Sequence, residues 1–181
     1  IHAPVLNEIK LRGENVANLC KVEIGRPKDI EICKKNFFEL MKYISGKSDT
    51  NRTKVIIENM GLINSLPISF YPYTREDFLG LFEMFPDTGL LLDVGHAKQY
   101  GNLQELISLD GKICEIHLHD IGATSGEKGR GHSPIKDIAF FEPLRELMKK
   151  DSLIFVFEHG GDCNEDEVLI GKKLLEKVLA D

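Results

Sequence analysis

The stretch Gly89-Leu-Leu-Leu-Asp93 is a short apolar run that ends in a carboxylate, and the chain repeats this design in three further places. These are the runs Lys54 to Glu58, Ile113 to His117 and Leu153 to Glu158. Longer segments with helical periodicity separate the runs, which is the pattern of βα units that build a parallel sheet. Runs made almost entirely of Val, Ile, Leu and Phe are typical of strands covered on both faces, although Glu115 interrupts one of them.

The segments between the runs carry the start signals and apolar stripes of helices. Three pairs have the spacing of an N-cap and its reciprocal acid: Thr74 with Asp77, Asn102 with Glu105, and Asn164 with Glu167. Two stripes of apolar residues fall on single helix faces, and we expect both to be core: Cys33, Phe37, Leu40, Met41 and Ile44, and Phe78, Leu81, Phe82 and Phe85.

Two segments lack a regular pattern. Residues 5 to 30 mix Gly13, Gly25 and Pro27 with charged residues, which predicts a long loop with a turn or two of helix. Residues 121 to 137 contain four glycines and three basic residues, which predicts a mobile loop over the strand ends.

Length and composition bound the class of protein. With 181 residues and 42% hydrophobic content, the chain is expected to form one domain over residues 1–181. A net charge of -6 argues against general binding to nucleic acid, and the chain has no apolar run near the roughly 20 residues that cross a bilayer. Four widely spaced cysteines indicate reduced thiols and a cytoplasmic location. The first residues, Ile-His-Ala-Pro, predict a fragment or a processed chain.

Each apolar run ends in a carboxylate or an imidazole, namely Glu58, Asp93, His117 and Glu158. The carboxyl ends of parallel strands form the active face of such sheets, because the loops converge there. The four residues are separated by 35, 24 and 41 positions, which agrees with about 30 residues per βα unit. A single carboxylate at a strand end is more often a helix cap or a surface charge, so the prediction of a shared site depends on all four.

Several carboxylates buried side by side repel one another unless a cation compensates them. Ligation by two Glu, one Asp and one His suits one divalent ion of Mn, Mg, Co or Zn, and the sequence leaves its identity open. His96, three residues beyond Asp93, is either a substrate-binding group or a second ligand. We interpret His119 and His159 as structural.

The motifs at these residues resemble the xylose isomerase-like barrel superfamily. They span residues 54 to 160 and are Ile-Ile-Glu58-Asn59, Leu-Asp93-Val-Gly-His96, Ile-His117-Leu-His-Asp120, His132-Ser-Pro-Ile and Phe-Glu158. The resemblance implies a (β/α)8 TIM barrel that is incomplete in this chain, with about the last five βα units present and the N-terminal strands missing. His2 would lie on the strand before Glu58.

The epimerase branch of that superfamily implies roles for the same residues. One divalent ion would be held by Glu58, Asp93, His117 and Glu158, and the two glutamates would form the acid/base pair in proton transfer next to a carbonyl. His96 would bind a substrate oxygen, and we add His132, Arg130 and His2 as substrate-binding candidates. The expected function is an isomerase or epimerase for a small sugar, a sugar phosphate or a hydroxy-carbonyl compound.

Two alternatives stay open. One is a zinc-dependent abasic-site endonuclease of type IV, whose three-zinc cluster also requires an Asp-x-His pair that the loop before His132 lacks. The other is a non-catalytic barrel remnant. The expected partner is a small carbohydrate-like molecule, without membrane or nucleic acid, and a homo-oligomer is one way to cover the open barrel edge.

Overall fold

The computed structural model describes residues 7–12, 21–27, 29–47, 54–60, 71–121, 132–159 and 163–180. The helices and strands, with η for 3-10 helices, are β1 (Asn7–Arg12), β2 (Lys21–Pro27), α1 (Ile30–Ser45), β3 (Ile56–Glu58), α2 (Arg75–Met84), β4 (Gly89–Asp93), α3 (Val94–Tyr100), α4 (Leu103–Ile107), η1 (Asp110–Lys112), β5 (Ile113–Leu118), η2 (Ile138–Leu144), α5 (Arg145–Met148), β6 (Ile154–Phe157) and α6 (Glu165–Ala180).

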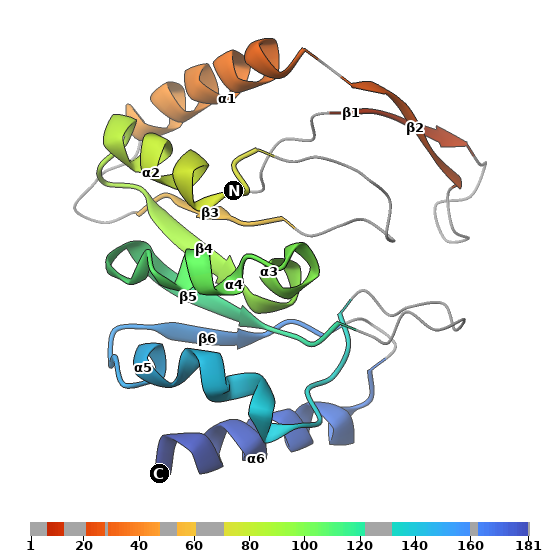
Figure 1. Cartoon of the computed structure of the whole chain (residues 1–181), viewed down its shortest axis with the longest axis vertical. Helices are drawn as coiled ribbons and strands as arrows, with labels where there is room; N and C mark the ends of the chain where they lie inside the picture. Colours follow the sequence, from red (N-terminus) through yellow and green to blue (C-terminus); the bar gives the residue numbers. More distant parts are fainter. Residues whose placement is uncertain are drawn as a thin grey trace.

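All four apolar runs form strands of one parallel sheet in the order β3-β4-β5-β6 (Figure 1). The prediction of a parallel α/β sheet with one helical connection after another is therefore confirmed. The strand expected before Glu58 would carry His2, and that residue lies outside the described part of the chain.

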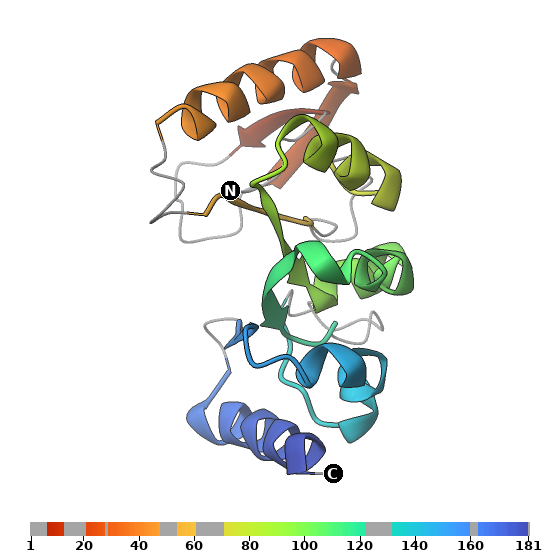
Figure 2. The same cartoon turned by 90° about the vertical axis from the view of Figure 1, so that its left-hand side faces the viewer.

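The core lies where the helices cover one face of the sheet. Figure 2, turned by 90° from Figure 1, shows α2, α4 and α5 on the same side of the strands. All five residues of β4 are buried, and Phe78, Leu81 and Phe82 of α2 are buried as predicted. The predicted capping box of Thr74 and Asp77 begins α2, and both of its hydrogen bonds are present.

Helix α1 is amphipathic but buries a narrower stripe than the sequence predicted. Phe37 and Met41 are buried, whereas Leu40 is 48% exposed, so its assignment to the core was wrong. Phe38 of α1 makes aromatic contacts with Tyr71 and Phe85, and Leu40 is not on the side of the helix that makes these contacts. Asp29, which the sequence did not single out, caps the start of α1.

The long loop expected over residues 5 to 30 was also wrong in part. Strands β1 and β2 pair antiparallel in a separate two-stranded sheet, which lies apart from the main sheet in Figure 1. Each strand of a two-stranded sheet is an edge strand, so Pro27 at the end of β2 removes no interior ladder hydrogen bond. Glycine and proline were therefore misleading as loop signals.

Of the other two predicted helix caps, one is confirmed and one is wrong. Asn164 and Glu167 exchange hydrogen bonds with each other's main-chain N–H groups before α6. Asn102 makes no side-chain cap to α4. Its Nδ2 donates to the Tyr73 carbonyl oxygen at 2.7 Å, while its Oδ1, the atom that would accept in a cap, has no hydrogen-bond partner among the described residues.

The pairing of β4 with β5 contains a register shift at Cys114. Leu90 pairs with Ile113 but Leu91 pairs with Glu115, so one extra residue of β5 is bulged out. Gly89 accommodates this bulge, because a Cβ on Gly89 would collide with the Cys114 sulfur. A bulge of one residue moves the following side chains to the other face of the sheet, and this one aligns His117 with Asp93.

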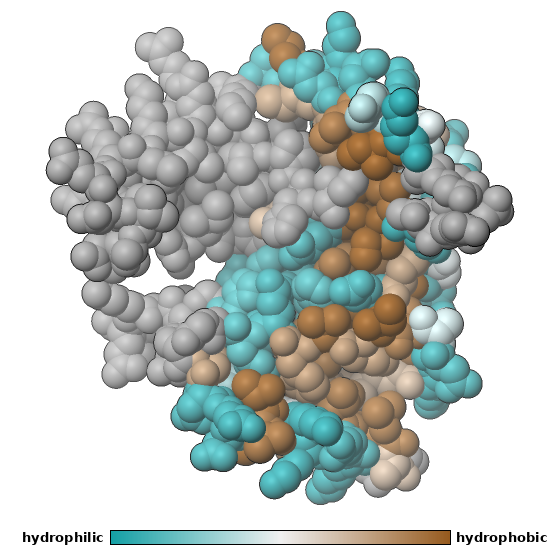
Figure 3. Space-filling view, turned by 180° about the vertical axis from the view of Figure 1, so that it is seen from behind, coloured by the Kyte–Doolittle hydropathy of each residue, from teal (hydrophilic) through white to brown (hydrophobic). Residues whose placement is uncertain are grey.

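The face seen from behind in Figure 3 carries hydrophobic residues in a band beside hydrophilic ones. Ile154 of β6 is 59% exposed although it belongs to a strand. Among the described residues, no helix has the length and apolar content that a membrane crossing requires.

Candidate metal centre

The strand register brings the four predicted ligands to one face of the sheet. Glu58 pairs with Leu91, two residues before Asp93, and Asp93 pairs with His117. His117 pairs with Val156, two residues before Glu158. Paired residues of neighbouring strands share a face, and so do residues two apart along a strand. Glu58, Asp93, His117 and Glu158 therefore all project from the same face at the carboxyl ends of the strands.

The side chains of these four residues meet. One donor atom from each lies within 4.8 Å of the donor atoms of the other three. Glu58 is 5% exposed and Asp93 is fully buried, while His117 and Glu158 are partly buried. The structure thus brings together the four groups that the sequence grouped.

Both ring nitrogens of His117 contact carboxylates. Nδ1 lies 2.8 Å from Glu158 Oε2, and Nε2 lies 2.9 Å from Glu115 Oε1. Burial alone would lower the pKa of His117, but hydrogen bonding to Glu115 and Glu158 outweighs it and raises the pKa. In the protein without a bound ion, an imidazolium between two carboxylates is therefore favoured.

Asp93 is held on several sides. Its Oδ1 accepts from the His96 main-chain N–H at 2.7 Å, and His119 Nε2 lies 2.9 Å from the same oxygen. The Asn59 amide donates to the Asp93 carbonyl and accepts from the Asp93 N–H. Burial would raise the pKa of this carboxyl group, but the histidines His119 and His96 more than offset it, so the pKa is lowered.

The residues present fit a divalent cation. Among the described residues, Asp93 Oδ2 is fully buried without a hydrogen-bond partner, although it belongs to an ionised carboxylate. Two carboxylates about 5 Å apart repel by about 3–4 kcal/mol at an effective dielectric constant near 20. The partial exposure of Glu158 reduces its share of this repulsion. A cation held by oxygen and nitrogen donors would relieve it and would give Oδ2 a partner.

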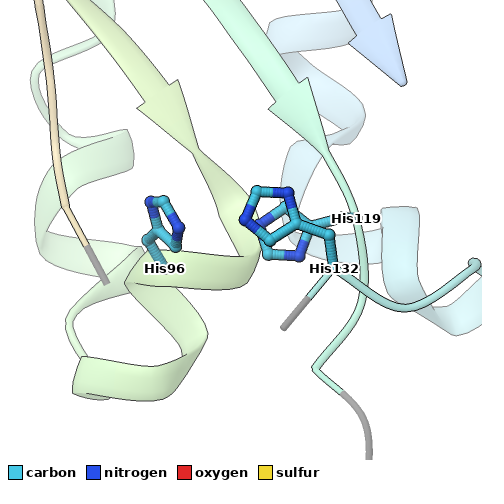
Figure 4. A group of neighbouring side chains, drawn as sticks. All are labelled: His96, His119 and His132. Carbon is cyan, nitrogen blue, oxygen red and sulfur yellow. The ribbon is translucent and has the colours of Figure 1, made fainter. Parts of the chain in front are cut away.

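His96, His119 and His132 form a second group (Figure 4). It adjoins the carboxylates, because His119 Nε2 lies 2.9 Å from Asp93 Oδ1. Each ring has its Nδ1 near a main-chain carbonyl oxygen: His96 near Asn59 at 3.0 Å, His119 near Asp120 at 3.1 Å and His132 near Glu158 at 3.1 Å. A carbonyl oxygen only accepts, so Nδ1 carries the proton in all three rings. In His96 and His132, Nε2 is then the acceptor nitrogen whenever the ring is neutral, whereas His119 Nε2 faces Asp93 Oδ1, an oxygen that also only accepts.

The trio differs from the carboxylate group in geometry. The rings of His119 and His132 are stacked, with centroids 4.0 Å apart and an angle of 3° between their planes. Lone pairs of parallel rings run side by side and do not converge on one ion. The arrangement is thus better suited to hydrogen bonding than to ligation of a second cation.

Burial and the neighbouring charges shift the pKa values of His96 and His119 in opposite directions. Burial lowers the pKa of His96 and outweighs the raising effect of Asp93. For His119, burial also lowers the pKa, but the Asp93 carboxylate prevails and the pKa is raised. His96 is therefore neutral near pH 7 and able to accept a hydrogen bond through Nε2, whereas protonation of His119 is favoured.

The remaining predicted site residues have different outcomes. His96 and His132 lie beside the carboxylates, whereas Arg130 and His2 lie outside the described residues. His159 stacks on Phe157, with ring centroids 5.7 Å apart.

Sequence reasoning missed three contributors. Glu115 is two residues before His117, and the two-residue period of a strand could have placed it on the same face. His119 was interpreted as structural, yet it contacts Asp93 directly. Asn59 follows Glu58, and no sequence signal indicated that its amide would bond to both main-chain groups of Asp93.

Comparison with known proteins agrees with this geometry. A family model described as "Xylose isomerase-like TIM barrel" matches residues 11–177, which is most of the chain. The chain belongs to this family. The predicted fold class is thereby confirmed, and the four parallel strands are part of a xylose isomerase-like barrel.

One solved structure similar to this xylose isomerase-like chain is titled "Crystal structure of D-tagatose 3-epimerase-like protein". The TM-score is 0.55 at 20% sequence identity, and the match covers 83% of this chain. The chain spans 56% of the length of that structure, so the likeness concerns the fold. No curated protein matches the chain.

Proposed function

We propose that this chain carries the metal centre of a divalent-metal-dependent isomerase or epimerase. Its substrate would be a small sugar, sugar phosphate or hydroxy-carbonyl compound, and Glu58, Asp93, His117 and Glu158 would hold one ion of Mn, Mg, Co or Zn. The observation that carries the proposal is the convergence of these four donors within 4.8 Å, around a buried Asp93 oxygen that has no hydrogen-bond partner among the described residues. The family and the fold of an epimerase-like protein support it.

The two glutamates supply the proton chemistry in this proposal. Glu58 is buried on β3 and Glu158 is partly exposed after β6. Because β3 and β6 are the two outer strands of the four-stranded sheet, the two glutamates approach the site from opposite edges of the sheet. One carboxylate removes the proton next to the carbonyl and the other returns it, which exchanges the substrate proton with solvent. A divalent ion at the site would stabilise the negative charge that develops on the carbonyl oxygen.

His96 and His132 are proposed to bind substrate hydroxyl groups. Main-chain carbonyls hold the Nδ1 proton of both rings, so Nε2 of a neutral ring accepts from a hydroxyl. This favours a substrate that is rich in hydroxyl donors. Arg130 and His2 stay candidates for substrate binding on the sequence alone.

Metal content tests the proposal first. The purified chain, loaded with Mn²⁺ or Co²⁺ and desalted, should retain about one ion per chain by elemental analysis. About three zinc ions per chain as purified, before any loading, would favour the abasic-site endonuclease instead. A folded chain that retains no metal would favour the non-catalytic remnant and would contradict the proposal.

Proton exchange tests the role of Glu158. Glu158→Gln should abolish the incorporation of deuterium from D₂O into a ketose that the wild-type chain labels, because an amide cannot take the proton. Glu146→Gln, on the exposed face of α5, is the matched control and should label normally. If Glu158→Gln exchanges as fast as the wild type while circular dichroism shows the same fold, Glu158 is not in the acid/base pair.

A further inference from the structure

We propose that Glu115 is a positioning residue, whose carboxylate accepts a hydrogen bond from Nε2–H of His117 and thereby presents Nδ1 of that ring to the cation. The inference rests on the proposed function, because it concerns the same metal site. It adds a fifth side chain, one that touches a ligand and not the ion.

The strand places Glu115 where this role requires it. Glu115 and His117 are two residues apart on β5 and therefore share its inner face. Glu115 pairs with Leu91, which itself pairs with Glu58, so the three residues form one row across the sheet. The side chain of Glu115 is only 24% exposed, and its Oε1 lies 2.9 Å from His117 Nε2. A solvated surface carboxylate would not be held in this way.

The contact between Glu115 and His117 decides which nitrogen of the imidazole carries the proton. A neutral imidazole has one N–H and one lone pair, and the hydrogen bond made by one nitrogen decides which tautomer the other presents. Nδ1 of His117 faces the site, 2.8 Å from Glu158 Oε2. For Nδ1 to act as a ligand its proton must leave, and the remaining proton must reside on Nε2. Glu115 is the acceptor at that position.

Orientation is the second effect of the contact. Metal-bound histidines almost always donate their other N–H to a carboxylate or carbonyl, which fixes the ring and increases the basicity of the ligand nitrogen. Loss of such a partner typically weakens metal binding by about 10–100-fold. Without Glu115 the His117 ring would be free to rotate and to adopt the Nδ1–H tautomer.

The affinity of the full chain for Mn²⁺ alone, measured by isothermal titration calorimetry, tests this role. Glu115→Ala should bind Mn²⁺ about 10–100-fold more weakly than the wild type. Glu115→Gln should recover most of the affinity, because the amide oxygen accepts the same hydrogen bond. Glu105→Ala removes one carboxylate from the exposed surface of α4, and its affinity should not change. Thermal unfolding of each metal-free variant reports whether it is folded.

The outcomes separate the role of Glu115 from the site itself. Equal affinities of Glu115→Ala and the wild type, or a Glu115→Gln variant as weak as Glu115→Ala, would overturn the inference and leave the metal site standing. If the wild-type chain binds no Mn²⁺, the proposed function and the inference fail together.

A measurement on the wild type avoids dependence on any variant. Long-range ¹H–¹⁵N spectra of the Zn²⁺-loaded chain should show the His117 ring with its proton on Nε2. A proton on Nδ1 in the loaded chain would overturn the inference even if Glu115→Ala does not fold.

Discussion

Replacing Gly95 with alanine should destabilise the protein by disturbing the contact between His119 and Asp93. Gly95 is the second residue of α3, and the His119 ring lies directly against its backbone. A Cβ at Gly95 would lie 2.5 Å from His119 Nε2 and closer still to two other ring atoms. His119 is fully buried and stacked on His132, so the ring has little room to move.

Two opposing effects decide the magnitude. The ring must retreat by about 1 Å or more to restore a van der Waals separation of about 3.5–4.0 Å, and overpacking of this kind costs about 1–3 kcal/mol. Alanine is a better helix residue than glycine by about 0.5–1 kcal/mol. We therefore expect a net loss of about 1–2 kcal/mol, which for a chain of this size lowers Tm by roughly 2–8 °C.

Urea unfolding of the metal-free chain measures this loss, and Gly80→Ala is the matched control. Gly80 lies inside α2, and a Cβ there would meet no atom within 4 Å. Gly80→Ala should therefore be neutral or stabilising by up to about 1 kcal/mol. The double variant Gly95→Ala/His119→Ala removes the clashing ring, so its loss should be smaller than the sum of the two single losses.

Two results would refute the reasoning. The first is a Gly95→Ala variant as stable as the wild type, with unchanged Mn²⁺ affinity. The second is strict additivity in the double variant, which would mean that Gly95 and His119 do not interact.

Three further predictions concern charge, capping and metal. The pKa of His119 is higher in the folded chain than its value of about 6.5 in the unfolded chain, so protonated His119 stabilises the fold at low pH, and this stability is lost as pH rises through the folded pKa. The loss of unfolding free energy in His119→Gln should therefore be larger at pH 6 than at pH 9. An equal loss at both pH values would contradict this. Thr74→Ala removes the capping box of α2 and should lower the unfolding free energy, measured by urea titration, by about 0.5–2 kcal/mol. An unchanged unfolding free energy would show that the cap does not stabilise the fold. Mn²⁺ at about 100 times its dissociation constant should stabilise the wild type by about 2.7 kcal/mol, and Glu58→Gln should show much less of this shift in thermal unfolding.

The parallel sheet and the convergence of the four ligands could be predicted because the signals for both are local. Each strand is a short, mainly apolar run, and each ligand lies at or next to its carboxyl end. Thr74 and Asn164 also cap helices by contacts that span three residues of sequence. Such features depend on neighbours in the chain, which the sequence displays.

The features that escaped prediction depend on contacts between distant segments. Asn102 has the sequence of a cap, but its Nδ2 bonds to the carbonyl oxygen of Tyr73, which is 29 residues away in the chain, and its Oδ1 caps nothing among the described residues. The bulge at Cys114 is defined only by the pairing of β5 with β4, and it decides which face His117 and Glu115 occupy. The exposure of Leu40 depends on which flank of α1 the rest of the fold covers. None of these can be read from periodicity.

The side chain of Asn59 continues the pairing of β3 with β4 beyond the last residue of β3. Its amide both donates to and accepts from the main chain of Asp93, as a strand residue would, and its own carbonyl oxygen bonds the His96 ring. Neither an amide nor a peptide group gains or loses a proton across the range in which carboxylates and imidazoles do. The hydrogen bonds that set the distance between the ends of β3 and β4 therefore do not depend on pH. The charges of the carboxylates and imidazoles that these strands carry do change with pH.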